Sequence, residues 1–447
     1  MLTTAFMIEL LEFSQRESLR SVAVRSRTDC WPHPAWKKRV VSLQQVSKKV
    51  AWVAVAGSLA LAAAACGSSG GTSNSGGGGH HGKTVPQISQ SDFNNQFTAM
   101  TKLKPLAAMG KGNVAVILPD TVSSARYVEF DAPYLTKSLQ LAGLKSSQFT
   151  VQNAQGSDAT ELSDAQTAIT KGASVLIMDP LDSTVGASIE KYAAAHGAVV
   201  IDYDRLTLGG SRKYYVSFNN VKVGNLLGQG LVSCVAAWKV KKPNVLVMYG
   251  DPTDNNATLF AQGYNAILNP KFKSGAWKSV GKAAGTWDPP TALSEFQQQF
   301  TAHPNINALL SPNDENAAPI ITYLQRKGVK PHTFPVTGQD ATLIGLQNVL
   351  AGYQCGTVYK PIYLEAQAAV ALAMYLRAGK TPPAGLTNGA TTLDVKTHQK
   401  VPSVLLTPTW VTTTNMNSTV IADKFVPAKQ LCTSKYAAAC KAAGISG

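Results

Sequence analysis

The sequence of 447 residues has few of the side chains on which metal, redox and nucleic-acid sites depend. It contains 7 histidines and 6 cysteines, and charged residues make up only 15% of it. No two cysteines have the C-x-x-C spacing of zinc or dithiol sites. No basic run is interleaved with aromatic residues, so we expect no nucleic-acid partner. We also expect no metal and no cofactor, and the low charge fraction favours a globular chain.

The chain also lacks an apolar run of the length that comfortably spans a bilayer. An apolar stretch at 50–65 follows Lys48 and Lys49 and ends at Cys66. A basic start, a short apolar segment and small residues at its end are typical of an export signal. We therefore predict that residues 1–65 are a leader and signal segment, and that the protein works outside the cytoplasm.

The segment 66–112 is predicted to be a tether and a lead-in to the folded part. Residues 67–79 are almost all Gly and Ser, a composition typical of a flexible linker. Without residues 1–65 the chain keeps 32 basic and 22 acidic side chains, a formal charge of +10. A basic exported protein could contact an anionic polymer or lipid of the cell surface.

From residue 113 onward, apolar strand-like runs alternate with amphipathic helical stretches, which is the pattern of parallel α/β sheets. One series runs through 114–118, 149–152, 173–178 and 199–203, and a second through 244–249, 279–283, 308–310 and 335–337. The pattern predicts an α/β fold with two Rossmann-like lobes. Extended segments at 356–361 and 401–408 are candidates for strands that cross between the lobes in a multi-strand hinge.

We predict an N-terminal lobe at 113–217, completed by about 357–400, and a C-terminal lobe at 218–356, completed by about 409–447. Cys432 and Cys440 lie close together near the C-terminus, and we expect them to form a disulfide that holds the tail. Cys234 and Cys355 allow two alternatives, a second disulfide or two buried free thiols.

The segment 199–205 combines a buried strand with a candidate ligand site. Its β-branched apolar run ends in Asp204 and Arg205, and the carboxyl ends of parallel strands face the ligand crevice in open α/β folds. A carboxylate beside a fork of N–H donors suits a neutral polyol, whose hydroxyls donate and accept. The alternative is an ordinary surface ion pair at a strand end.

Polar and aromatic clusters follow most of the other predicted strands as well. A crevice lined by carboxylates, amides, cations and aromatic rings is typical of sugar recognition, because rings pack on the C–H face of a pyranose. A single Asn or Asp after a strand is more often a helix N-cap, so the prediction depends on the joint pattern. The clusters are Asp120 with Arg126 and Tyr127, Asp204 with Arg205, 254–256, Trp287 with Asp288, Asn313 with Asp314, Gln339 with Asp340, and Tyr359 with Lys360.

From about Asn113 to Val426 the chain resembles the periplasmic sugar-binding proteins of ABC importers, and most closely their xylose-binding members. The motifs that carry the resemblance lie in order at 203–205, 217–220, 254–257, 311–314, 338–341, 358–361 and 401–408. The resemblance implies a sugar held by Arg126, Asp204, Arg205, Asn256, Trp287, Asn313, Asp340 and Lys360. Tyr127 stands where the xylose-binding members have Trp, so it offers a smaller stacking surface.

Cys66 also resembles the lipidated cysteine of bacterial lipoproteins, although Ala63 stands where their motif usually has Leu. These resemblances imply a monomeric, lipid-anchored protein on the outer face of the membrane. It would capture a monosaccharide and deliver it to an ABC permease and its ATPase. One alternative is a sugar-sensing module of a receptor or kinase. The other is a carbohydrate-active enzyme with Asp204 and Asp340 as acid and base, although each carboxylate has a cationic neighbour and we expect no enzyme.

Overall fold

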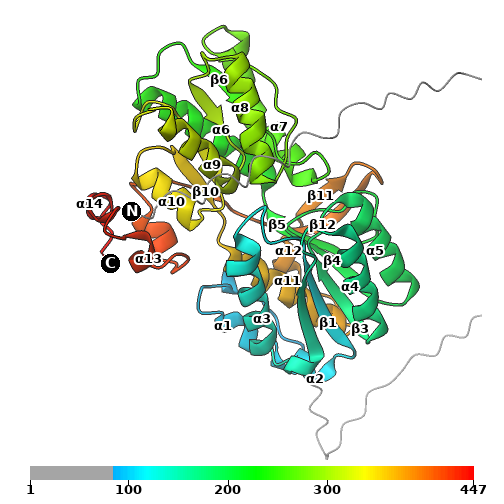
Figure 1. Ribbon diagram of the computed structural model, residues 1–447. Helices are drawn as coiled ribbons and strands as arrows, with labels where there is room; N and C mark the ends of the chain where they lie inside the picture. The colour runs from blue at the N-terminus through cyan, green and yellow to red at the C-terminus, as the bar shows by residue number, and fades with distance from the viewer. Residues whose placement is uncertain (1–83, 447) are drawn as a thin grey trace, which may run out of the picture. The chain divides into compact units, whose positions relative to one another are not determined.

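The strands of the computed structural model fall into two groups, which define two lobes (Figure 1). The structure describes residues 84–446, which belong to one compact unit. The strands are β1 (Asn113–Leu118), β2 (Phe149–Asn153), β3 (Ala173–Met178), β4 (Val199–Tyr203), β5 (Tyr214–Phe218), β6 (Asn244–Val247), β7 (Lys278–Ser279), β8 (Ala308–Leu310), β9 (Thr337–Gln339), β10 (Gly356–Tyr359), β11 (Thr391–Asp394), β12 (Gln399–Leu406) and β13 (Thr409–Val411).

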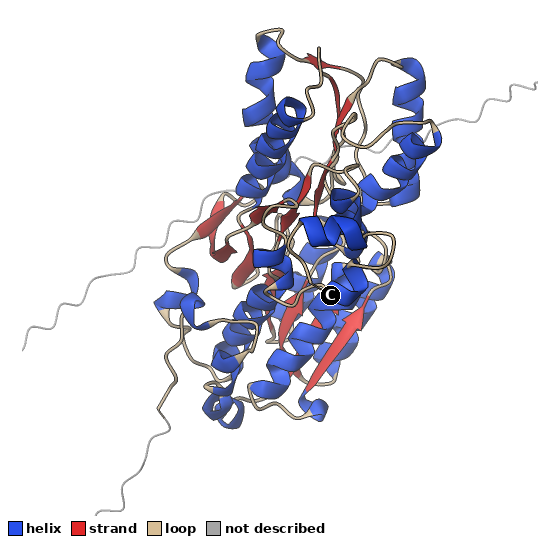
Figure 2. Cartoon of the chain, turned by 90° about the vertical axis from the view of Figure 1, so that its left-hand side faces the viewer, coloured by secondary structure: helices blue, strands red, loops and turns tan. Residues whose placement is uncertain are grey.

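Helices separate most of these strands, and in each lobe the strands form a layer with helices beside it (Figure 2). The α-helices are α1 (Thr98–Thr101), α2 (Lys104–Met109), α3 (Ala132–Leu141), α4 (Asp158–Thr170), α5 (Ser183–Ala195), α6 (Asn220–Ala237), α7 (Asn255–Lys273), α8 (Pro289–Ala302), α9 (Asp314–Arg326), α10 (Leu343–Leu350), α11 (Ile362–Arg377), α12 (Ala384–Thr387), α13 (Ala428–Leu431) and α14 (Ala437–Ala442). Short 3₁₀ or π turns are η1 (Gln90–Asp92), η2 (Tyr127–Asp131), η3 (Ser146–Gln148) and η4 (Asn417–Ile421).

The first lobe is built on a seven-stranded sheet in the order β11-β12-β5-β4-β3-β1-β2. All neighbours are parallel except the pair β11 and β12. Successive side chains of β1 enter different apolar clusters, with Val114 and Val116 on one face and Ala115 and Ile117 on the other. A strand buried on both faces needs an unbroken apolar run, which explains the β-branched composition of these segments.

The second lobe has shorter strands in two three-stranded sheets, β7-β6-β8 and β13-β10-β9. A parallel bridge between Leu309 and Val336 joins them beside β8 and β9. The alternation of the first lobe recurs here, since Val245 and Leu246 of β6 belong to separate apolar clusters. The two α/β lobes predicted from the sequence are therefore present.

The chain crosses between the lobes three times. After β5 it enters α6, which packs on β8, β9, β10 and β13. After β10 it passes through Lys360 and Pro361 into α11, which packs on β3, β4 and β5. After β12 it returns through Thr407 and Pro408 to β13. The segments expected to cross, 356–361 and 401–408, contain the second and third of these connections.

One predicted helix begins with a π-helical segment. The sequence predicts a helix at 124–143, and the structure has a helix there, in which the π-helix η2 continues directly into α3. The side chain of Asp120 accepts hydrogen bonds from the backbone N–H groups of Val122 and Ser123, which holds 121–123 in a turn. The helical part therefore begins only near Tyr127, and this turn directs residues 123–127 toward the other lobe.

The C-terminal tail packs across both lobes. The ring of Phe425 stacks on Phe130 of the first lobe at a centroid distance of 3.8 Å, and it meets Tyr359 of β10 at 5.0 Å. The hydroxyls of Tyr359 and Tyr363 donate to the Asp423 carboxylate at 2.9 and 3.2 Å. The tail thus bridges the lobes beside the hinge.

Both cysteine pairs of the described region form disulfides. The expected bridge between Cys432 and Cys440 is present, and it closes the tail. Cys234 of α6 is bonded to Cys355, directly before β10, so the alternative of two free thiols is wrong. Cys66 lies outside the described residues.

Candidate functional site

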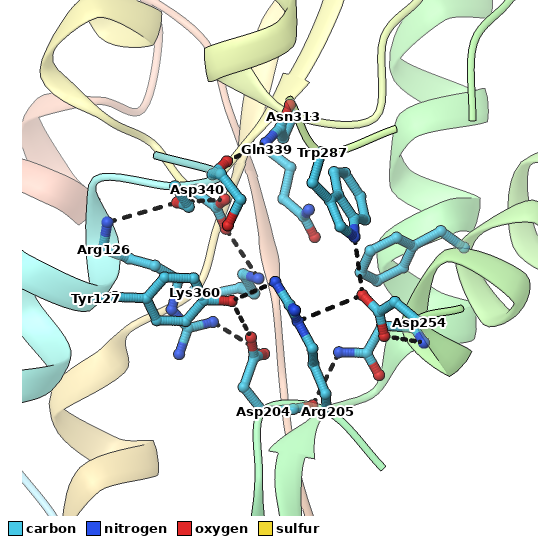
Figure 3. Close-up of a pocket in the computed structure, with 14 residues that line it drawn as sticks. Arg126, Tyr127, Asp204, Arg205, Asp254, Trp287, Asn313, Gln339, Asp340 and Lys360 are labelled. Carbon is cyan, nitrogen blue, oxygen red and sulfur yellow. Dashed lines mark hydrogen bonds and ion pairs between the residues drawn. The ribbon is translucent and has the colours of Figure 1, made fainter. Parts of the chain in front are cut away.

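A polar cavity lies between the two lobes, at the carboxyl ends of strands from both (Figure 3). All nine ligand-binding residues predicted from the sequence line it. The cavity lining consists of Ser123, Ser124, Arg126, Tyr127, Asp204, Arg205, Asp254, Asn256, Phe260, Trp287, Asn313, Gln339, Asp340 and Lys360. The structure thus brings the predicted residues to one place, while their contacts with a ligand stay a prediction.

Five lining residues are absent from the predicted set: Ser123, Ser124, Asp254, Phe260 and Gln339. Asp254 and Gln339 belong to strand-end clusters already noted in the sequence. Phe260 lies four residues after Asn256, the spacing at which two side chains share one face of a helix. The two serines carry no such signal, because the turn made by Asp120 positions them.

Arg126 lies at the centre of a buried charge network and is only 1% exposed. Its Nε and Nη2 donate to the Asp131 carboxylate at 2.9 and 2.7 Å, and Nη2 also donates to Glu365 at 2.6 Å. Its Nη1 lies 3.0 Å from Asp204 Oδ1 but has no aligned hydrogen bond among the described residues. This buried N–H group therefore has unused hydrogen-bonding capacity.

Asp204 and Arg205 both contact Tyr127. The Tyr127 hydroxyl donates to Asp204 Oδ2 at 3.1 Å and accepts from Arg205 Nη2 at 3.2 Å. Arg205 Nε lies 3.6 Å from Asp254 of the second lobe and 3.7 Å from Asp179. These contacts exclude the alternative of a solvent-exposed ion pair at the end of β4.

The backbone at Asp204 has a left-handed conformation, with φ of 55°. Its carbonyl accepts hydrogen bonds at 2.8 Å from Tyr215 Oη, Ser217 Oγ and Asn256 Nδ2. Such a conformation is unfavourable for a residue other than glycine, so the surrounding bonds must hold it. They orient the Asp204 carboxylate into the cavity. Asn256 therefore supports the site as well as lining it.

Two aromatic rings of the cavity lining, those of Trp287 and Phe260, come from the second lobe. Trp287 Nε1 donates to Asp254 Oδ2 at 3.0 Å, and the indole meets the Phe260 ring edge to face at 6.4 Å. A Cβ atom at Gly250 would lie 2.2 Å from the Trp287 ring, so only glycine permits this position of the indole. The ring is thus held at the edge of the cavity (Figure 3).

Direct hydrogen bonds join the lobes at the mouth of the cavity. Ser124 Oγ donates to Asp340 Oδ2 at 3.0 Å, and Asn313 Nδ2 donates to the Ser123 carbonyl at 2.9 Å. Lys360, at the hinge, pairs with Asp340 Oδ1 at 2.8 Å. The lobes are therefore closed against each other in this structure.

Three of the lining side chains are carboxylates, Asp204, Asp254 and Asp340, and three are cations, Arg126, Arg205 and Lys360 (Figure 3). Burial opposes ionisation of Asp204, but the charges of Arg126 and Lys360 prevail and lower the pKa of its carboxyl. Burial likewise opposes charge on Lys360, but Asp340 and Asp204 raise the pKa of its ammonium group. Burial raises the pKa of Asp254 against the charge of Arg205. Asp204 stays ionised and can accept hydrogen bonds from hydroxyl groups at neutral pH.

The arrangement defines a class of protein: a hinged pair of α/β lobes that encloses a small polar molecule. The model of the periplasmic binding protein domain family matches residues 114–381, and the chain belongs to this family. Its fold is that of the type I periplasmic binding proteins. No helix of the described residues is long and apolar enough to cross a membrane.

Curated relatives and solved structures agree with this placement. The chain is 37% identical over 279 residues to the D-xylose-binding periplasmic protein of Escherichia coli, covering 62% of this chain and 80% of the relative. It is 33% identical over 350 residues to the multiple sugar-binding periplasmic receptor ChvE of Rhizobium radiobacter, covering 73% and 94%. A carbohydrate transporter solute-binding protein of Chloroflexus aurantiacus, solved with D-glucose, is 27% identical with a TM-score of 0.63, covering 71% of this chain and 97% of that one.

Proposed function

We propose that the protein captures a monosaccharide, xylose or a related sugar, outside the cytoplasmic membrane and delivers it to an ABC importer. The observation that carries the proposal is the polar cavity lined by both lobes. Its cations and carboxylates are already paired with one another, so they offer both donors and acceptors to a ligand, which suits a neutral polyol. The relatives named for xylose and for multiple sugars support the same ligand class.

The proposed roles follow from the geometry of each side chain. The carboxylates of Asp204 and Asp340 accept hydrogen bonds from sugar hydroxyls, and Nη1 of Arg126 donates one. Lys360 and Arg205 supply further donors, and the amides of Asn256 and Asn313 add weaker polar contacts. The rings of Trp287 and Tyr127 pack on the C–H face of the sugar.

Ligand capture is proposed to depend on closure of the hinge. A sugar in the cavity contacts both lobes only when they are closed, so binding shifts the population toward the closed state. The bonds from Ser124 to Asp340 and from Asn313 to Ser123 form in that state. Binding and closure are therefore one coupled equilibrium.

Titration calorimetry with a panel of pentoses and hexoses tests this function. We expect Asp204→Ala and Asp340→Ala each to weaken sugar binding by about 100-fold, because each removes a charged hydrogen-bond acceptor. Asp164→Ala, on the outer helix α4, is the matched control and should bind as the wild type does. Unchanged affinity in both cavity variants would exclude the proposed site.

The permease and the ATPase are proposed to be separate chains, and the protein is proposed to be a lipid-anchored monomer. Cys66 is the proposed lipidation site, so Cys66→Ser should release the protein from the membrane fraction while sugar affinity stays the same. Cell fractionation measures the release, intact mass detects the attached lipid, and titration calorimetry measures the sugar affinity. Retention of the Cys66→Ser protein in the membrane fraction contradicts the anchor.

We propose that the chain does no chemistry on the sugar. Asp204 and Asp340, the carboxylates considered for acid and base, each pair with a cation, Arg126 and Lys360 respectively. Incubation with pentoses or aryl glycosides should leave them unchanged, as followed by chromatography. Formation of a product that Asp204→Ala abolishes would restore the enzyme alternative.

A further inference from the structure

In the second lobe, acidic and basic side chains lie at opposite ends of the strands. Within 219–359, six of the seven carboxylates lie between a strand and the following helix or in the first turn of that helix. They are Asp251, Asp254, Asp288, Asp314, Glu315 and Asp340, and the seventh is Glu295 within α8. The edge that carries the cavity therefore holds nearly all the negative charge of this lobe.

The opposite edge of the lobe, at the amino ends of the strands, carries exposed cations. We call these residues the basic face: Lys239, Lys241, Lys242, Lys273, Lys278, Arg326, Lys327 and Lys330. The segments that supply them, 221–250, 255–287 and 316–339, contain no Asp or Glu. The basic face thus has no acidic neighbour along the chain.

The loops of the basic face lie side by side. The backbone N–H of Lys278 donates to the Pro243 carbonyl at 2.8 Å, which joins the loops before β7 and β6. The side chain of Asn307 donates to the carbonyls of Lys241 and Lys242 at 3.5 and 3.4 Å, which adds the loop before β8. Trp238 meets His332 of the loop before β9 at 5.2 Å. The loops therefore form one strip in the order of the strands, in which the loops before β7, β6 and β9 carry the cations and the loop before β8 carries none.

Helix ends alone do not account for this strip. Lysine and arginine in the last turn of a helix interact favourably with its dipole, which explains Lys273 and Arg326. Lys241, Lys242 and Lys278 lie beyond the helix ends. Within residues 84–446, no carboxylate lies within ion-pair distance of any cation of the basic face.

The corresponding loops of the first lobe provide an internal comparison. There the loops before β1, β2 and β3 contribute one exposed lysine each: Lys111, Lys145 and Lys171. The loops before β6 and β9 contribute three cations each, counting Arg326 at the end of α9. A shared fold therefore does not by itself require so much positive charge.

We propose that the basic face binds a linear polyanion outside the cell membrane, a polymer with phosphate or carboxylate groups at intervals along its length. Charge complementarity selects an anionic partner, and a strip that follows successive loops matches an extended chain. A bilayer fits less well, because surfaces that lie on membranes add apolar side chains to their cations. The exposed large hydrophobic residues of the described chain, Val122, Val128, Ile344, Leu393 and Val395, all lie outside the basic face.

A polymer on this edge leaves the ligand cavity accessible. The cavity opens at the carboxyl ends of the strands and the basic face lies at their amino ends. Binding of the polymer would retain the protein at the cell surface without competing with the sugar. The two binding events are therefore expected to be independent.

Binding to long-chain inorganic polyphosphate tests the proposal at physiological and at raised salt. The test variant is Lys241→Glu/Lys242→Glu/Lys278→Glu, and the matched control is Lys111→Glu/Lys145→Glu/Lys171→Glu, with the same change of net charge. We expect the test variant to lose at least about tenfold in affinity and the control less than about twofold. Wild-type affinity should fall steeply with salt, because bound counterions are released.

Three results would overturn the proposal. Equal losses of affinity in the two variants would mean that the net charge of the protein, and not the basic face, determines binding. Failure of the wild-type protein to bind polyphosphate at physiological salt would exclude a polyanion as the partner. Equally tight binding to vesicles of equimolar phosphatidylcholine and phosphatidylglycerol, lost in the same variant, would indicate a membrane partner instead. Sugar affinity is measured on the same samples, so failure of the basic face and failure of the sugar site remain distinguishable.

Discussion

The two lobes share an architecture but are stabilised differently. The first lobe has one continuous seven-stranded sheet and buried ion clusters around Arg126 and Arg212. The second lobe has strands of two to four residues in two small sheets, and the disulfide between Cys234 and Cys355 joins its helix α6 to the start of β10. The first lobe has no disulfide within residues 84–446.

The difference indicates how a lobe with short strands can stay rigid. Few ladder hydrogen bonds hold its strands, so helix packing and a covalent link must contribute more. A Cβ atom at Gly224 of α6 would lie 2.0 Å from the carbonyl oxygen of Phe260 on α7, so these two helices meet at their backbones. The second lobe thus combines close helix contact with a cross-link, whereas the first depends on its sheet and buried charges.

The largest predicted effect is loss of the cross-link in the second lobe. Cys234→Ala/Cys355→Ala should lower the free energy of unfolding by about 5 kcal/mol, because the bond closes a loop of 121 residues. Cys432→Ala/Cys440→Ala removes a bond between residues only 8 positions apart and should lower the free energy of unfolding by about 2 to 3 kcal/mol. Urea denaturation of both variants measures the difference. Equal losses would mean that loop closure does not explain the stability of the second lobe.

The next effect concerns the buried charges of the first lobe. Arg126→Met leaves the carboxylates of Asp131 and Glu365 buried without their cation, and it should lower the free energy of unfolding by about 3 to 5 kcal/mol. Lys102→Met, which breaks an ion pair with Asp92 at a half-exposed site, should change it by less than about 1 kcal/mol. Thermal unfolding compares the two. A small loss in Arg126→Met would show that the network adds little stability.

A third prediction tests the tail that joins the lobes. Phe425→Ala removes a buried ring between Phe130 and Tyr359 and should lower the free energy of unfolding by about 3 kcal/mol. Without sugar, the variant should also be more open, because the ring contacts both lobes. Small-angle scattering measures the radius of gyration with and without ligand. Identical radii of gyration in wild type and variant would mean that the tail does not affect closure of the lobes.

The smallest effect is a pH dependence within the first lobe. Burial opposes ionisation of Asp394, but hydrogen bonds from Arg212 and from the Gly209 N–H at 3.0 Å lower its pKa from 3.8 to about 2. A lowered folded-state pKa stabilises the fold above pH 3.8, and this stability is lost as the pH falls from 3.8 through about 2. Asp394→Asn should therefore lower the free energy of unfolding by about 2 kcal/mol at neutral pH.

Denaturation of Asp394→Asn and wild type across the acid range checks this sign. The difference between the two proteins should shrink as the pH falls toward 2, where the wild-type carboxyl becomes protonated. If the difference in unfolding free energy between the two proteins stays constant with pH, the loss of stability in Asp394→Asn comes from packing rather than from charge.

Much of the fold was predictable because buried strands have a simple signature. The apolar runs at 114–118, 173–178 and 199–203 correspond to β1, β3 and β4, since a parallel strand buried on both faces cannot alternate with polar residues. The sequence pattern did not predict helices α9, α10 and α11. α11 is buried almost all round, so it lacks the polar face that gives a helix its period. The bounds of the two lobes remain our proposal.

The candidate site was partly predictable for a related reason. Polar residues directly after a buried strand, such as Asp204 and Asp340, are placed by the sheet itself, because all parallel strands end at one edge. Arg126 is placed instead by Asp131 and Glu365, which lie 5 and 239 residues away along the chain. The first kind of position depends on local sequence, and the second depends on a contact that no local pattern reveals.

The sequence alone thus determined the two α/β series, the strand ends that carry polar groups and the close pair Cys432 and Cys440, because each is set by residues near one another in the chain. Only the tertiary structure decided that Cys234 meets Cys355, that Phe425 lies between the lobes, and that the lysine-rich loops of the second lobe form one strip. Those features join segments far apart in sequence, and only the packing of the sheets and helices brings them together.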